Sequence, residues 1–331
     1  MIVSRAPLRF SLGGGGSDLP AYYRSFGGFV VSAAIDRYVY VTANKRFYED
    51  IRLSYSETEI VPRVDAIRHR IFREALRMTG IERGIELTSV ADLPANSGLG
   101  SSGAFTVALL NALHAYNRNF VSSRLLAEEA CELEMVRLGD PVGKQDQYIA
   151  AYGNVTRLEI DRDGNVEVAP VPVRPEVLDE LEHNLLIAYT GIERPARTVL
   201  SEQGERLRGA NADALASMHR IRELGQEVYR LLVSGDIDAY GELLHEHWTR
   251  KQKLAASVSD AAIDAYYDAA RRAGALGGKL MGAGGGGFFM FYVRPEARRR
   301  VAEELERLKL RQLRFRFELD GARIVANMHR S

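Results

Sequence analysis

The chain has 331 residues, of which 46% are hydrophobic and 27% charged, a composition typical of globular proteins and unlike that of collagen, disordered chains or coiled coils. At roughly 150 residues per domain, the length predicts one large domain or two ordinary ones. The 44 Lys and Arg residues balance 44 Asp and Glu residues, which argues against a nucleic-acid or membrane-surface partner. An anionic ligand would therefore have to be bound by a local arrangement of residues.

Cysteine content and hydropathy indicate the compartment. Cys131 is the single cysteine, so an intrachain disulfide and a cysteine-rich metal site are excluded, and a reducing environment is favoured. Apolar runs such as 288–293 are much shorter than the roughly 18 residues that span a bilayer. The first seven residues lack the charged and apolar regions of a secretion signal. We therefore expect a cytoplasmic protein.

Strand patterns dominate the first 92 residues, and helical patterns are more frequent after them. Apolar periodicity and turn residues predict strands at 2–12, 29–42, 52–55 and 85–90, with one helix at 62–78. The later segments are predicted as helices at 104–115, 125–138, 212–233, 239–256, 261–273 and 295–309, and strands at 154–160, 166–171, 184–189, 288–293, 313–317 and 323–326.

Strand blocks and helix blocks that do not alternate regularly favour an α+β fold over a doubly wound sheet. Residues 179–183, just before a predicted strand, are a plausible joint between domains. We therefore expect an N-terminal domain at 1–182 and a C-terminal domain at 183–331.

Three glycine-rich segments, at 13–18, 98–103 and 282–287, are candidate ligand loops. Glycine lets the backbone approach a ligand and present N–H groups to a phosphate. The middle segment runs directly into an apolar helical pattern, and the N–H groups and dipole at the start of a helix form an anion site. Its serines are suited to cap the helix or to place a hydroxyl on Mg²⁺.

Other nucleotide-binding patterns are not satisfied. The spacing Gly-x-Gly-x-x-Gly occurs at 98–103 and 282–287, but without the βαβ unit and downstream acid of a dinucleotide site. A Walker loop fails because Lys279 is followed by Leu280 rather than Ser or Thr. Signatures of protein kinases are also absent.

Two acidic residues complete a possible phosphoryl-transfer site. Such a reaction needs a phosphate cradle, a metal held by oxygen ligands, and a group that orients or deprotonates the acceptor. Ser102 and Glu134 can supply metal ligands, and Asp146 can act as the base. Taken alone, Glu134 also fits a solvated helix position beside other glutamates, and Asp146 is ambiguous.

At this point the sequence resembles the GHMP kinase superfamily, named for galactokinase, homoserine kinase, mevalonate kinase and phosphomevalonate kinase. Segment 5–18 is similar to its first motif, 94–104 to its second and 279–287 to its third, in the family's order. Within the superfamily the chain is most similar to the D-glycero-D-manno-heptose 7-phosphate kinases, through 13–20, 140–148, 189–192 and 274–287. Related fucose and heptose kinases share some of these segments.

The resemblance implies a two-domain fold with the active site in the cleft between the domains, and it implies a role for each matching residue. The ATP phosphate loop would consist of Gly98, Leu99, Gly100, Ser101 and Ser102. Mg²⁺ would be held by Ser102 and Glu134. Asp146 would be the base that faces the sugar hydroxyl, and Arg9 would lie beside it and stabilise developing charge.

The same comparison implies a substrate site made of Gly15, Ser17, Asp18, Gly284 and Gly285, in which Asp18 accepts hydrogen bonds from sugar hydroxyls. The chain departs from the family at three places. The segment before Asp146 has one more residue than in mevalonate kinases, so the role of Glu134 is assigned by counting back from Gly139. The Glu-His or Glu-Asn of many members is replaced by 14–16, three glycines, which suggests room for a bulkier phosphorylated acceptor. The Ala of the second motif is Gly103.

The expected activity is therefore ATP- and Mg²⁺-dependent phosphorylation of the anomeric hydroxyl of a heptose 7-phosphate. Two alternatives stay open: a 1-kinase for a free sugar, either heptose or L-fucose, and a non-catalytic sensor of nucleotide or sugar phosphate. The expected ligands are ATP and a sugar phosphate, with no nucleic acid or membrane, and the oligomeric state is undetermined. The sequence does not choose among candidates for a second cationic pocket, namely Arg37, Lys144, Arg194, Arg197 and Lys251. His245 and His247 point to different helix faces and are interpreted as surface or packing residues.

Overall fold

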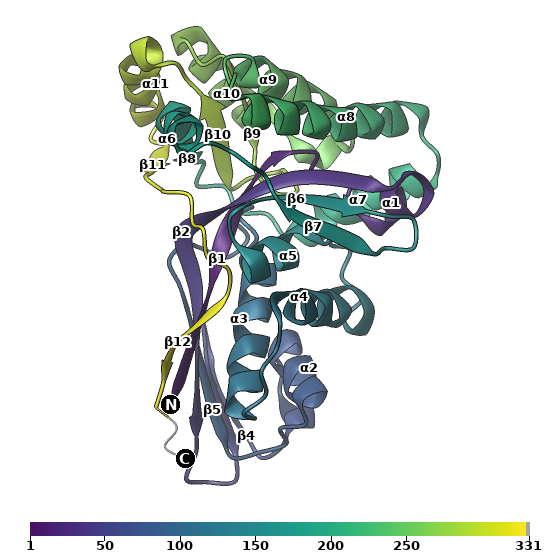
Figure 1. The fold of residues 1–331 in the computed structure, drawn as a ribbon, viewed down its shortest axis with the longest axis vertical. Coiled ribbons are helices and arrows are strands. Elements are labelled where there is room, and N and C mark those ends of the chain that lie inside the picture. The colour runs from purple at the N-terminus through teal and green to yellow at the C-terminus, as the bar shows by residue number, and fades with distance from the viewer. Residues whose placement is uncertain (329–331) are drawn as a thin grey trace.

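The computed structural model describes residues 1–328, which form two β-sheets with helices packed against them (Figure 1). Among these residues every strand pair is antiparallel except β3 with β5. The first sheet occupies the lower part of Figure 1 and the second sheet the upper part. This arrangement confirms the α+β class.

The first sheet runs in the order β12-β1-β2-β5-β3-β4, with β6 paired to β2 and β7 paired to β6. Its strands are β1 (Ile2–Gly13), β2 (Gly28–Lys45), β3 (Ile51–Ser54), β4 (Thr58–Val61), β5 (Ile85–Ala91), β6 (Val155–Ile160), β7 (Val166–Pro170) and β12 (Arg323–Asn327). The last of these strands returns from the far end of the chain, so that Ile2 lies opposite Asn327.

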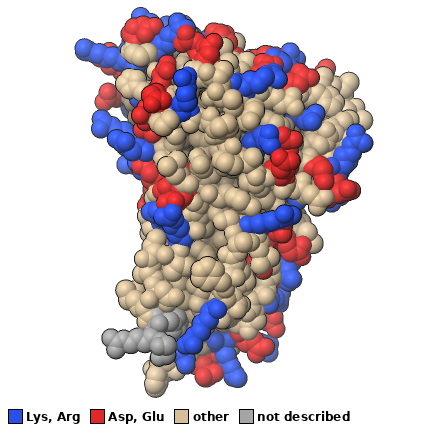
Figure 2. Space-filling view, viewed as in Figure 1, with Lys and Arg blue, Asp and Glu red and all other residues tan. Residues whose placement is uncertain are grey.

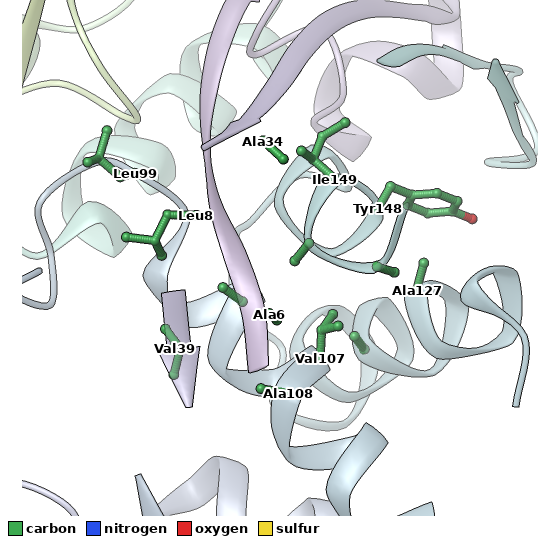
Figure 3. Close-up of a cluster of buried hydrophobic side chains, with 14 of the residues drawn as sticks. Ala6, Leu8, Ala34, Val39, Leu99, Val107, Ala108, Ala127, Tyr148 and Ile149 are labelled. Carbon is green, nitrogen blue, oxygen red and sulfur yellow. The ribbon is translucent and has the colours of Figure 1, made fainter. Parts of the chain in front are cut away.

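Helices cover one face of this sheet, as Figure 1 shows. They are α2 (Arg70–Thr79), which follows the 3₁₀ turn η1 (Val64–Ala66), α3 (Ser101–Tyr116), α4 (Ser123–Cys131) and α5 (Gln145–Tyr152). Nine residues of α3 are buried, because this helix packs against both β1 and β2 and is itself covered by α2 and α4. Figure 3 shows part of the resulting core, including Leu8 of β1 and Val107 of α3.

The second sheet runs in the order β11-β8-β10-β9. Its strands are β8 (Leu185–Tyr189), β9 (Gly277–Leu280), β10 (Phe288–Tyr292) and β11 (Arg311–Leu313). The helices around it are α9 (Tyr240–Lys251), α10 (Ala261–Ala273) and α11 (Pro295–Arg307), with the 3₁₀ turn η3 (Ala256–Val258). Helix α8 (Ala212–Ser234) packs against α9 and against β1 and β2 of the first sheet. Trp248 of α9 is buried against Phe289 of β10, so the single tryptophan belongs to this second core.

Several helices differ from the predicted ones. The helices α1 (Pro20–Phe26), α5, α6 (Pro175–Asn184) and α7 (Ala196–Arg208) were not predicted. The seven residues of α1 and the eight of α5 make only about two turns, which give too short a periodic pattern. The expected joint at 179–183 is wrong as a linker, since it lies within α6, where Val177 and Leu181 are buried on one face. The division into 1–182 and 183–331 stays a prediction: β8 begins the second sheet just after it, but β12 returns to the first.

Charged side chains of both signs are mixed on the face shown in Figure 2, in keeping with the zero formal charge. Within residues 1–328, helices that combine the length and the apolar character needed to cross a bilayer are absent.

Candidate active site

Arg9 and Asp146 form an ion pair where β1 meets α5. Arg9 Nε donates to Asp146 Oδ1 at 2.8 Å, and one terminal nitrogen lies 2.7 Å from the same oxygen. The other terminal nitrogen donates to the carbonyl of Gly98 at 2.7 Å. Arg9 is almost fully buried, whereas the side chain of Asp146 is 28% exposed. The pair is therefore held rigidly on the Arg9 side and open to a ligand on the Asp146 side.

The middle glycine segment wraps around this pair and opens α3. Gly98 and Gly100 both have positive φ, +82° and +79°, a conformation that favours glycine. Gly100 is the N-cap of α3 and has no side chain to satisfy the first N–H groups, so these donors stay available for an anion. The hydroxyls of Ser97 and Ser101 are buried in residues that line the pocket, and neither has a hydrogen-bond partner among residues 1–328.

Ser102 and Glu134 lie in contact at the other side of the α3 N-terminus. The predicted helix at 125–138 is in fact α4 followed by a π-helical segment, η2 (Glu132–Arg137), and this wider turn leaves Leu133 and Glu134 both buried. The Ser102 hydroxyl donates to Glu134 Oε1, and Gln147 Nε2 donates to Oε2 at 2.6 Å. Burial raises the pKa of Glu134 to about 7, although these two hydrogen bonds act in the opposite direction.

One hydroxyl and one carboxylate fit Mg²⁺ better than they fit a transition metal. Mg²⁺ is usually held by one or two carboxylates and by substrate phosphates. In the described part of the chain there is no group of three or more His, Cys, Asp or Glu residues arranged for a metal. Ser102 and Glu134 are thus suited to a cation whose other ligands come from a nucleotide bound at the α3 N-terminus.

Asp18 lines the opposite side of the pocket. It accepts hydrogen bonds from the backbone N–H of Gly16 at 2.9 Å and of Gln145 at 3.0 Å. Burial and the nearby charge of Asp146 raise its pKa. A buried carboxyl with oxygen capacity left is suited to accept hydrogen bonds from the hydroxyls of a sugar.

The structure brings most of the predicted site residues together in one pocket. The residues that line it are Arg9, Ser11, Gly15, Gly16, Asp18, Leu19, Asn96, Ser97, Gly98, Gly100, Ser101, Ser102, Val142, Gly143, Gln145, Asp146, Ala196, Leu200, Gln203, His247, Lys251, Leu254, Lys279, Leu280, Gly282 and Ala283. Members come from both sheets and their helices, so the pocket lies between the two halves of the fold.

Five predicted residues lie outside this lining: Ser17, Leu99, Glu134, Gly284 and Gly285. Glu134 instead contacts Ser102, which does line it. Ser17 Oγ bonds to the backbone of Gly14 and Phe29, and Leu99 packs in the core. Gly284 and Gly285 lie against Val258 and Ser257 rather than the pocket.

The third glycine segment reaches the pocket through Gly282 instead. A Cβ on this residue would lie 2.6 Å from the Cα of Gly98, so the second and third glycine segments touch through their backbones.

Among the five candidates for a cationic pocket, Lys251 is the one that lines it. Each of the others is engaged elsewhere by an acidic side chain or a carbonyl: Arg37 by Asp36, Lys144 by Gly164, Arg194 by Asp260 and Arg197 by Asp140.

Two pocket residues, His247 and Lys279, were missed by sequence reasoning. The interpretation of His247 as a surface or packing residue overlooked its neighbour Lys251, four positions away on the same face of α9. Lys279 lies three residues before the third glycine segment, a position that could have identified it as a candidate. His245 instead contacts Tyr267 through its ring nitrogen.

A phosphate cradle, a buried carboxylate beside a serine, and an Arg–Asp pair in one pocket define a phosphotransferase site. The family model described as "GHMP kinases N terminal domain" matches residues 65–154, and the model "GHMP kinases C terminal" matches residues 228–310. The chain belongs to the GHMP kinases.

The relatives named in this comparison are sugar and mevalonate kinases. A D-glycero-alpha-D-manno-heptose 7-phosphate kinase of Campylobacter jejuni is 27% identical over 97% of this chain and 98% of its own. The crystal structure of a D-glycero-D-manno-heptose 1-phosphate kinase from Bacteroides thetaiotaomicron superposes with a TM-score of 0.82 at 27% identity, covering 99% of this chain and 100% of that one. A Lactococcus lactis galactokinase complexed with galactose shares the fold, with a TM-score of 0.75 at 20% identity over 97% of this chain and 94% of that one.

Proposed function

We propose that this kinase transfers the γ-phosphoryl group of ATP to the anomeric hydroxyl of D-glycero-D-manno-heptose 7-phosphate, giving the 1,7-bisphosphate. The observation that carries the proposal is the Arg9–Asp146 ion pair, which faces the same pocket as the N–H groups at the start of α3 that no side chain caps. The names of two relatives that align over nearly the whole chain support a heptose phosphate as the acceptor, although they differ in the position of its phosphate.

In this reaction Asp146 accepts the proton of the anomeric hydroxyl. The hydroxyl oxygen forms a bond to the γ-phosphorus, the bond between that phosphorus and the bridging oxygen of ADP breaks, and ADP leaves. Arg9 keeps the carboxylate of Asp146 in place and sets a positive charge beside the transferred group. Asp18 accepts hydrogen bonds from sugar hydroxyls and so orients the ring.

The start of α3, from Gly98 to Ser102, would hold the phosphates of ATP. Ser102 and Glu134 would hold Mg²⁺, which supplies charge neutralisation for the phosphate oxygens when it is bound. A cytoplasmic location, where ATP is available, is part of this proposal.

The test is ADP release with Mg·ATP against a panel of acceptors: D-glycero-D-manno-heptose 7-phosphate, the 1-phosphate of the same sugar, the free heptose, L-fucose and galactose. Turnover of the 7-phosphate, with a new phosphorus signal at C1 of the product, is the expected result. Turnover confined to a free sugar would show that this sugar, and not heptose 7-phosphate, is the acceptor. ATP binding without turnover of any sugar would favour the sensor function.

A further inference from the structure

Three basic side chains from the second half of the fold form one wall of the pocket. His247 and Lys251 lie four residues apart on α9, and Lys279 lies on β9, which packs against α9. Their exposed fractions are 4%, 8% and 2%, and all three line the pocket. This basic wall, consisting of His247, Lys251 and Lys279, comes from α9 and β9 rather than from the glycine segment at the start of α3.

Lys279 has no partner of its own. Among residues 1–328, no carboxylate or carbonyl accepts a hydrogen bond from its ammonium group, whereas Lys251 Nζ donates to the carbonyls of Leu280 at 2.8 Å and Gly282 at 2.6 Å. An ammonium group on a largely buried side chain is costly to leave without an acceptor, so Lys279 is a candidate to bind an anion in the pocket.

The acids of the pocket do not neutralise this wall. Asp18 and Asp146 are the two carboxylates in its lining. Asp146 is paired with Arg9, and Asp18 accepts backbone N–H groups on the far side. Burial lowers the pKa of both lysines and of His247. The charge of Arg9 acts in the same direction on both lysines, and the charge of Lys251 does so on Lys279 and His247. A bound anion would offset this effect by favouring the protonated lysines, so the wall is suited to an anionic ligand.

We propose that Lys279, supported by Lys251 and His247, binds a phosphate group of the substrates at a site distinct from the loop that begins α3. This inference rests on the proposed function, because it assigns the wall to a phosphate that enters the pocket during that reaction. The phosphate is either the one the acceptor already carries or the γ-phosphoryl group in transfer. Both lysines line the same pocket as Arg9 and Asp146, into which both phosphates would enter.

Calorimetric binding of inorganic phosphate tests the site without depending on turnover. Lys279→Met roughly keeps the length of the side chain and removes its charge, whereas Lys279→Arg keeps the positive charge. Lys45→Met, at an exposed lysine of β2, is the control. We expect Lys279→Met to weaken phosphate binding by about ten-fold or more, the effect of losing one hydrogen bond to a charged group. Lys279→Arg should recover part of the affinity, and the control should match the original protein.

Kinetics with two acceptors then separate the sources. If Lys279→Met lowers turnover of heptose 7-phosphate and leaves turnover of the free heptose unaffected, the wall binds the phosphate that the acceptor already carries. If Lys279→Met lowers kcat equally for both acceptors and leaves KM for the acceptor unchanged, the wall binds the γ-phosphoryl group during its transfer. If a folded Lys279→Met protein binds phosphate as the original protein does, the proposed phosphate site is wrong, whatever the panel of acceptors shows. If Lys279→Met loses phosphate binding but the original protein phosphorylates none of the acceptors, only the proposed function is wrong.

Discussion

Gly103 of α3 and Asp146 of α5 are packed so closely that a side chain on the first would collide with the second. A Cβ added at position 103 would lie 2.7 Å from Asp146 Cβ and 3.1 Å from its carbonyl carbon. This distance is shorter than real Cβ contacts, so a larger residue would have to displace Asp146. The glycine that departs from the family's usual alanine thus sets the position of the proposed base.

The first prediction concerns this contact. Gly103→Ala should lower kcat by roughly a hundred-fold, because a shift of about 1 Å in a reacting group has an effect of that order. ATP affinity, measured by calorimetry, should change little, since the N–H donors at the start of α3 remain. Gly204→Ala in α7 is the control, because its neighbour is the flexible end of Arg208. Full activity of Gly103→Ala would show that Asp146 tolerates the displacement.

The second prediction concerns the proposed base. Asp146→Asn should keep the fold and ATP binding but reduce turnover by about 10²–10⁴-fold, the range for loss of a general base. Single-turnover kinetics should place the loss in the chemical step rather than in product release. Asp179→Asn, at an exposed position of α6, is the matched control. Substantial residual turnover in Asp146→Asn would exclude proton transfer to this carboxylate.

The third prediction concerns Mg²⁺. Glu134→Gln should raise the Mg²⁺ concentration needed for half-maximal activity by about ten-fold or more, because a neutral amide is a much weaker ligand than a carboxylate. Glu132→Gln, two residues earlier in η2 and exposed, should leave the titration unchanged. If both variants titrate like the original protein, Glu134 has a structural role toward Ser102 and Gln147 only.

The fourth prediction concerns pH. Burial lowers the pKa of Lys251 to about 7, with a further effect from Arg9, and the pKa values of Lys279 and His247 are also lowered. These groups therefore lose their protons more readily than free side chains do, and Lys251 does so as pH rises through about 7 in the ligand-free protein. A dianion stabilises their protonated forms, so binding should take up protons and weaken as pH rises above about 7.

Sulfate is the suitable probe for this effect because it does not titrate near neutrality. Calorimetry at about pH 8 in two buffers with different ionisation enthalpies should show proton uptake on sulfate binding, and Lys251→Met should reduce it. Equal binding enthalpies in the two buffers would contradict the prediction.

The sequence predicted the residues proposed to take part in phosphoryl transfer better than the basic residues that line the rest of the pocket. Glycine-rich segments and the residue types at 9, 102, 134 and 146 carry a local signal, and the structure places these four side chains around the start of α3. The π-helical turn that buries Glu134 has no comparable signal, because it differs from an α-helix by one residue. Lys279 and His247 meet only when β9 packs on α9, which is a tertiary event that local patterns do not encode.

The pairing of β12 with β1 also bears on how the chain folds as it leaves the ribosome. The outer edge of β1 stays open until residues 323–327 have been made, since these residues form its neighbour. Met328 N then donates to Met1 O at 2.8 Å, which joins the two extremes of the described chain. An unpaired edge is a template for pairing with other chains. Nascent chains of this protein therefore carry their greatest risk of misassembly until the last strand is synthesised, and loss of that strand should favour aggregation.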